Sequence, residues 1–257
     1  LEQPPAPVNT TPSRLSIALD GWWAFLPAQA PASQLPSQGW GLARVPGYWT
    51  APGEALDAAG KPLGNRWLGN PVTDYRLAYY QRTFTPPTDW KGKPIFLAFE
   101  GVDGLAQILL NGQPLAWLLG WEYESYDVAD RLRWGETNTL TVVLHTRGDS
   151  PRAGLYGSVS LRAMPDSFTD HLTVQPLVDS RRVRFSCDLW HGGAAGSAAL
   201  RFIVTPRGSG GVEKHFLQDL PLDPADRSRL AFSTQCRRVE ATFDWPEAHL
   251  WNLDDPY

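Results

Sequence analysis

Short runs in which apolar and polar residues alternate recur about every ten residues along this chain, with turn residues between them. One run places Ile95, Leu97 and Phe99 on a single side. An apolar residue at every second position is typical of a half-buried β-strand, whereas the helical period of about 3.6 residues is nearly absent. Many short strands separated by turns are typical of a sandwich or a barrel. The chain is therefore predicted to be all-β.

The clearest turn signal is Asn111-Gly112, because both residues tolerate the positive φ angles of a type I′ hairpin. It predicts that strands near 105–110 and 113–119 pair with each other. Helical structure is expected in one place, over 128–133, where Asp127 can act as the N-cap.

The composition and pattern of the sequence change after Met164-Pro165: aromatic residues become rarer, and a new alternation of apolar and polar residues starts at Val183. We place a domain boundary there, since 257 residues suit two modules. The predicted parts are a mobile leader over 1–14, a first sandwich over 15–164 and a second sandwich over 165–257.

The second module shows five or six strand-like runs, whereas an immunoglobulin-like sandwich has about seven. Runs over 201–205, 213–217 and 239–245 are expected to be strands. The segment from Trp245-Pro246 onward is polar and turn-like, and no closing strand follows it. The module is therefore expected to lack its last strand.

Charge and hydropathy argue against two classes of partner. Lys and Arg total 23 against 27 Asp and Glu, a net charge of −4, which argues against nucleic acid held by phosphate neutralisation. No run approaches the roughly 18 apolar residues of a membrane span. The chain begins at Leu1 rather than Met, and Asn9-Thr10-Thr11 is a glycosylation sequon. These features favour a periplasmic or extracellular protein, or an excised fragment.

Sharp catalytic and metal-binding motifs are absent: there is no phosphate loop, no His-Glu-x-x-His and no nucleophile elbow. The five histidines show no ligand spacing, and Cys187 and Cys236 lack the paired spacing of a zinc site. We therefore expect neither a metal nor another cofactor. The two cysteines could form a disulfide or remain buried thiols, and the sequence leaves both open.

A pair of carboxylates is all that glycoside hydrolysis requires. Glu100 and Asp103 flank Gly101, and Glu122 and Glu124 lie in an aromatic loop near Asp127. The favoured interpretation is a solvated loop and a helix cap, so no catalytic pair is predicted.

Tryptophan is unusually common, with 12 copies against a single Met. The apolar faces of sugars stack on exposed indole rings while their hydroxyl groups bind nearby polar groups. Most of the tryptophans are expected to fill the core or an interface. Those at Trp22, Trp23, Trp40, Trp49 and Trp67 fall in a long N-terminal stretch that reads as irregular. Trp117 and Trp121 lie in or beside loops and are candidates for a sugar platform.

A set of linked motifs carries a family resemblance. The chain over about 15–163 resembles the N-terminal sugar-binding domain of family 2 glycoside hydrolases, which include β-galactosidases, β-glucuronidases and β-mannosidases. The motifs are Tyr79-Tyr80-Gln81-Arg82-Thr83-Phe84, Phe99-Glu100-Gly101-Val102-Asp103, Asn111-Gly112, Tyr126-Asp127-Val128, Gly135-Glu136-Thr137-Asn138-Thr139-Leu140 and Gly154-Leu155-Tyr156-Gly157-Ser158-Val159.

The resemblance implies a galactose-binding-like jelly roll followed by an immunoglobulin-like sandwich. Family members carry both catalytic glutamates in a barrel beyond these domains, so the resemblance assigns no catalytic residue to this chain. Loops of the first domain sometimes reach the barrel mouth in the family, and Asn70 and Asp149 are the nearest matches to such residues, with Trp67 beside Asn70. Ser158 stands where the family commonly has Asp.

The implied partners are the non-reducing end of a β-glycoside, bound weakly, and the absent barrel of the same polypeptide. The expected function is therefore that of a non-catalytic sugar-binding and scaffold region of a β-glycosidase. A free-standing carbohydrate-binding module and a structural β-sandwich remain the alternatives.

Overall fold

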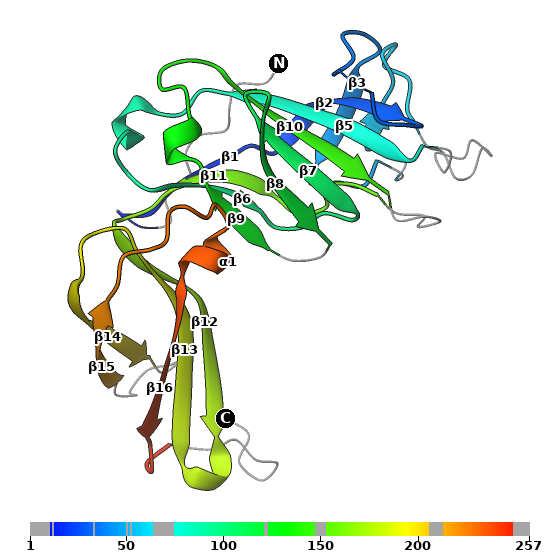
Figure 1. Ribbon diagram of the computed structural model, residues 1–257. Helices are drawn as coiled ribbons and strands as arrows, with labels where there is room; N and C mark the ends of the chain where they lie inside the picture. The colour runs from blue at the N-terminus through cyan, green and yellow to red at the C-terminus, as the bar shows by residue number, and fades with distance from the viewer. Residues whose placement is uncertain are drawn as a thin grey trace. The chain divides into compact units, whose positions relative to one another are not determined.

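The computed structural model describes residues 11, 13–32, 34–49, 51, 53–63, 75–120, 123–146, 153–205 and 213–248. The described residues form two compact units (Figure 1). One unit falls within Leu1–Pro165 and also includes Ser228–Thr234, and the other falls within Asp166–Arg227 and Gln235–Tyr257. Both are built almost entirely of strands, which confirms the predicted all-β class.

The first unit is a sandwich of two antiparallel sheets that face each other (Figure 1). The seven-stranded sheet has the order β4-β3-β2-β5-β10-β7-β8, and the four-stranded sheet has the order β1-β11-β6-β9. The strands are β1 (Leu15–Ala18), β2 (Gly21–Ala28), β3 (Gly41–Val45), β4 (Ala55–Leu56), β5 (Leu77–Phe84), β6 (Ile95–Phe99), β7 (Leu105–Leu110), β8 (Gln113–Leu119), β9 (Glu124–Asp127), β10 (Asn138–His145) and β11 (Val159–Ala163). Two 3₁₀ turns, η2 (Thr88–Trp90) and η3 (Ala129–Arg131), connect them.

The core lies between the two sheets and is filled by the alternating residues of the central strands. Leu140, Val142 and Leu144 of β10 are fully buried in it. The predicted hairpin is confirmed, because β7 and β8 pair and Leu110 lies opposite Gln113. The φ angles of Asn111 and Gly112 are 54° and 77°, as a type I′ turn requires.

Two expectations for the first unit are wrong. Residues 128–133 do not form a helix, because Leu132 is already extended and only the 3₁₀ turn η3 forms, with the Ala129 amide donating to the Asp127 carboxylate at 3.2 Å. Trp22 and Trp23 are not in an irregular stretch but in β2. Trp23 is fully buried and donates its indole N–H to the Leu19 carbonyl at 2.8 Å.

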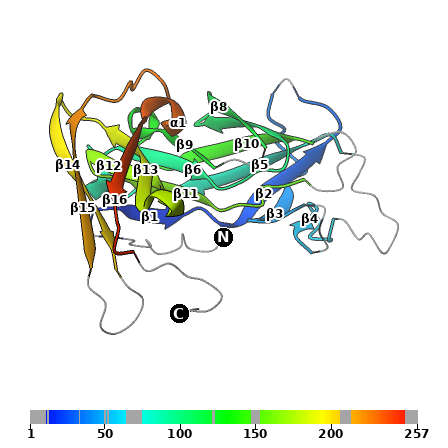
Figure 2. The ribbon, with the colours of Figure 1, turned by 90° about the horizontal axis from the view of Figure 1, so that it is seen from below.

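The second unit contains a three-stranded sheet, β12-β13-β16, and a two-stranded sheet, β14-β15, whose strands lie side by side in Figure 2. The bounds are β12 (Ser167–Leu177), β13 (Arg182–His191), β14 (Gly196–Val204), β15 (Lys214–Leu222) and β16 (Arg237–Asp244), with the 3₁₀ turn η4 (Val178–Ser180) after β12. Phe185 and Phe202 stack in its core with ring centroids 4.5 Å apart. No disulfide joins Cys187 to Cys236, and Cys187 is buried in β13. The missing last strand stays a prediction.

The segment Ser228–Thr234 belongs to the first unit although β15 precedes it and β16 follows it in sequence. The Asp127 amide donates to the Leu230 carbonyl at 2.8 Å, and Tyr126 forms an antiparallel bridge with Ala231. This segment therefore extends the four-stranded sheet beyond β9. Phe232, at the start of the short helix α1 (Phe232–Gln235), is buried against Phe96 with ring centroids 5.9 Å apart.

Candidate functional site

Strand register brings several chain connections to one end of the first unit. Leu77 at the start of β5 lies opposite His145 at the end of β10, and His145 lies opposite Leu105 at the start of β7. Leu105 in turn lies opposite Leu119 at the end of β8. We call this end, with the connecting segments 47–49, 101–104 and 153–157, the loop end.

Backbone hydrogen bonds hold the three connecting segments of the loop end together. The Gly47 amide donates to Leu155 at 2.8 Å and the Trp49 amide to Ala153 at 3.0 Å. The Asp103 amide donates to Gly154 at 2.9 Å. These connections are therefore fixed to one another by main-chain contacts.

Glycine is required at position 154 by this close approach. A Cβ atom there would lie 2.2 Å from the Gly47 carbonyl oxygen and 2.8 Å from the Tyr48 Cα. Both neighbours are backbone atoms, so they cannot give way without moving a chain segment.

We expect Gly154→Ala to lower the free energy of unfolding by about 1–3 kcal/mol, as overpacking in a dense region does. Thermal unfolding followed by circular dichroism measures the change. Gly196→Ala is the matched control, because the nearest neighbour of a Cβ there is 3.9 Å away. Equal melting temperatures for the two variants would show that the contact at Gly154 is not tight.

Aromatic and carboxylate side chains gather at the loop end. Tyr48 and Tyr156 stack with centroids 5.7 Å apart and planes 11° from parallel, and Asp103 is 3% exposed. Burial raises the pKa of Tyr156, and the nearby Tyr48 and Asp103 raise it further. The Tyr156 phenol is therefore neutral at physiological pH and keeps its hydroxyl hydrogen for donation. Sequence reasoning missed this tyrosine pair, although Tyr156 lies inside one of the linked motifs.

Trp117 is the predicted platform residue that the structure describes. It lies on the edge strand β8 and is 56% exposed. The centroid of its ring lies 6.1 Å from that of the His145 ring. Leu105 and Leu119, which are 37% and 61% exposed, flank it on neighbouring positions of β7 and β8. The exposure of Trp117 leaves one indole face available to a ligand.

The other predicted site residues, Trp67, Asn70, Trp121 and Asp149, lie outside the described residues. The described residues begin again just before β5. They break off just after β8 and just after β10. The described ends of β5, β8 and β10 at these breaks lie at the loop end.

Three carboxylates singled out in the sequence form ion pairs or hydrogen bonds within the structure. Glu100 forms an ion pair with Arg162 at 3.0 Å, and Glu124 accepts hydrogen bonds from the Ser233 amide and hydroxyl. Asp127 caps η3 as described above. Within the described ranges, no group of three or more His, Cys, Asp or Glu residues could hold a metal ion. No helix among these residues is long and apolar enough to cross a membrane.

Comparisons with known proteins show what this chain is similar to. Residues 67–153 match the glycosyl hydrolase 2 galactose-binding domain-like family. A β-galactosidase of Priestia megaterium is 25% identical over 162 residues, which cover 55% of this chain and 15% of that protein. A β-glucuronidase of Formosa agariphila is 30% identical over 134 residues, which cover 45% of this chain and 12% of that protein.

The fold is shared over almost the whole chain. A calcium-binding mutant of Bacteroides uniformis β-glucuronidase 2 superposes with a TM-score of 0.68 at 19% identity, covering 95% of this chain and 29% of that one. The chain thus spans less than a third of these relatives. It is similar to the galactose-binding-like N-terminal domain region of family 2 glycoside hydrolases.

Proposed function

We propose that this chain is the part of a retaining β-glycosidase that supports the catalytic barrel and contributes one wall of its sugar pocket through the loop end. The observation that carries the proposal is the strand register, which gathers Trp117, the start of β5 and the end of β10 at the same end as the Tyr48–Tyr156 pair. A secreted, periplasmic or extracellular location fits such an enzyme.

The chemistry of the loop end suits a wall rather than a complete active site. An exposed indole offers a stacking face to a sugar ring. A single wall buries little of a ligand, whereas a complete pocket buries about 70–90% of it. Binding by this chain alone is therefore expected to be weak, on the order of millimolar.

A free-standing carbohydrate-binding module is the second candidate, and the 56% exposure of Trp117 is the observation that favours it. Such a module would bind sugar through the platform without any barrel. The two functions differ in the affinity expected of the isolated chain.

We expect galactose, mannose or glucuronate to shift the Trp117 indole resonance in an NMR titration that reaches tens of millimolar. Trp117→Ala should weaken binding about fivefold, since a stacking contact contributes about 1 kcal/mol. Leu217→Ala is the matched control, because Leu217 is 59% exposed in the second unit. Micromolar affinity would favour the free-standing module. If no sugar shifts any indole resonance, the loop end has only a scaffold role in the isolated chain.

A further inference from the structure

A pocket lies at the end of β5 that is opposite to the loop end, where β2 separates from β5. β2 pairs with β5 from Ala24 to Ala28, but from Gly21 to Trp23 its partner is β3 alone. Beyond Gln81, β5 therefore has no neighbour on that side among the described strands. The opening holds a pocket of about 420 Å³, which is within the range of roughly 300–1,000 Å³ for small-molecule sites.

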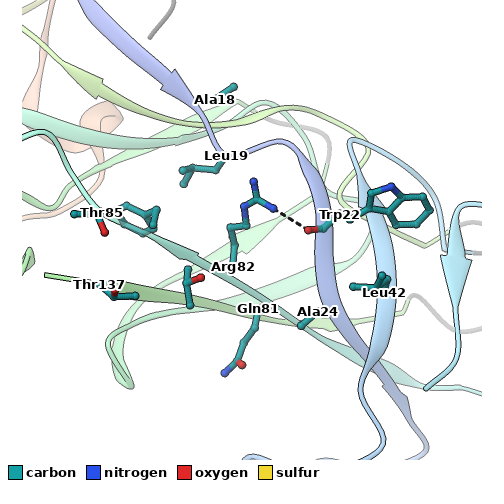
Figure 3. Close-up of a pocket in the computed structure, with 11 residues that line it drawn as sticks. Ala18, Leu19, Trp22, Ala24, Leu42, Gln81, Arg82, Thr85 and Thr137 are labelled. Atoms are coloured by element: carbon teal, nitrogen blue, oxygen red, sulfur yellow. Dashed lines mark hydrogen bonds between the residues drawn. The ribbon is translucent and has the colours of Figure 1, made fainter. Parts of the chain in front are cut away.

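Arg82 occupies the centre of this pocket (Figure 3). Its guanidinium group reaches across the gap between the strands and donates one hydrogen bond to the Trp22 carbonyl oxygen at 2.8 Å. No carboxylate of a described residue forms an ion pair with it. Most of the N–H donors of the guanidinium fork therefore have no protein acceptor in the part of the chain that the structure describes.

Arg162 in the same unit shows how differently a structural arginine is arranged. Its guanidinium group donates to the Ser160 hydroxyl at 3.0 Å, to the Tyr123 hydroxyl at 2.9 Å and to Glu100 at 3.0 Å. That set satisfies the cation and neutralises its charge. Arg82 has a comparable partly buried setting, but no described residue supplies a counter-ion, so an anion in the pocket would gain charge-assisted hydrogen bonds.

The rest of the pocket lining combines an aromatic and apolar wall with small polar groups. Trp22, Ala24 and Leu42 form the apolar part. The polar groups are the side chains of Gln81, Thr83, Thr85 and Thr137. A sugar packs the face of its ring on an apolar wall, and its hydroxyl groups form hydrogen bonds with polar side chains. This lining offers both kinds of contact.

We propose that this pocket binds a uronic acid unit, with its carboxylate on the Arg82 fork and its ring against Ala24 and Leu42 of the apolar wall. A guanidinium group recognises a planar carboxylate through two parallel N–H···O bonds, which a neutral sugar cannot accept in the same way. The site is distinct from the loop end and does not depend on the function proposed for it.

Calorimetric and NMR titrations of the whole chain at low salt test the proposal with four probes. Glucuronate carries both ring and carboxylate, glucose has the ring alone, acetate has the carboxylate alone, and sulfate is an anion without a ring. We expect glucuronate to bind at least about tenfold more tightly than the other three, because a hydrogen bond to a charged group contributes about 1.5–3 kcal/mol. Its binding should shift the Trp22 indole resonance.

Arg82→Gln should reduce glucuronate affinity to that of glucose, whereas Arg44→Gln, a change of equal charge on β3 outside the pocket lining, should change it less than about threefold. The two sites are read separately, because binding at this pocket should shift the Trp22 indole resonance and binding at the loop end the Trp117 indole resonance. If Arg82→Gln fails to fold, Arg82→Lys keeps the charge without the fork and should still weaken binding several-fold. Equal affinity for glucose and glucuronate, equal affinity for sulfate, or no loss in either Arg82 variant would overturn the proposal.

Discussion

Replacing Phe232 by alanine is expected to lower the free energy of unfolding of the first unit by about 3–5 kcal/mol, as truncation of a buried aromatic residue does. Phe232 is 2% exposed and packs edge-on against Phe96 of β6. Phe96 is itself 2% exposed, although its neighbours Ile95 and Leu97 are the β6 residues that belong to the core between the sheets. Phe232 therefore covers a large aromatic residue outside that core.

The same substitution should also loosen the edge of the four-stranded sheet. The Asp127 amide has the Leu230 carbonyl as its acceptor, so this bond depends on the segment that Phe232 anchors. Hydrogen exchange of the Asp127 amide should become faster in Phe232→Ala. In Leu172→Ala, which truncates a residue that is 61% exposed in β12, stability should change by less than about 0.5 kcal/mol. Unchanged stability and exchange in Phe232→Ala would mean that the segment is not part of the first unit in solution.

Structure that depends on neighbours in sequence could be predicted from the sequence. Asn111-Gly112 specifies a turn through the φ angles of two adjacent residues, so the β7–β8 hairpin was predicted with its bounds. Period-two alternation likewise predicted that Ile95, Leu97 and Phe99 share one face of β6, and these three residues lie in the core between the sheets. Trp117 was expected in or beside a loop, whereas it is an exposed residue within β8.

Contacts between distant segments could not be predicted in this way. Ser233 and Glu124 are 109 residues apart, and nothing in the local pattern of 228–234 indicates that it extends the sheet at β9. β12 was missed as well, because its alternation is broken by a register shift between Asp170 and Thr173 and most of its side chains are exposed.

The Arg82 pocket has the same origin. It exists because β2 stays paired with β3 but has no pairing with β5 before Ala24, and strand pairing is a tertiary property. In the sequence, Arg82 is only one polar position of an alternating run, so the absence of a counter-ion among the described residues becomes visible in the structure alone.

A buried amide network at the other end of the β7–β8 hairpin gives the second large expected effect. Asn138, at the start of β10, is fully buried. Its side chain accepts hydrogen bonds from the Asn111 side chain and the Arg133 amide, both at 2.9 Å. It also donates to the Arg133 carbonyl at 2.9 Å and to the Glu136 carbonyl at 3.1 Å. One side chain thus holds the turn before β10 and the hairpin turn together.

Asn138→Ala is expected to lower the free energy of unfolding by about 3 kcal/mol. Each buried polar group left without its partner costs about 1–3 kcal/mol, and part of this loss is recovered where water reaches the turn. The Thr139 amide donates to the Asn111 side chain at 3.0 Å, so its hydrogen exchange should also become faster. Urea unfolding measures the stability, with Gln113→Ala as the control, since Gln113 is exposed in the same hairpin. Asn138→Asp should be no better than alanine, because it keeps the size of the side chain but loses both amide donors and adds a buried charge. A loss below about 1 kcal/mol for both Asn138 variants would show that the turns keep their positions without this side chain.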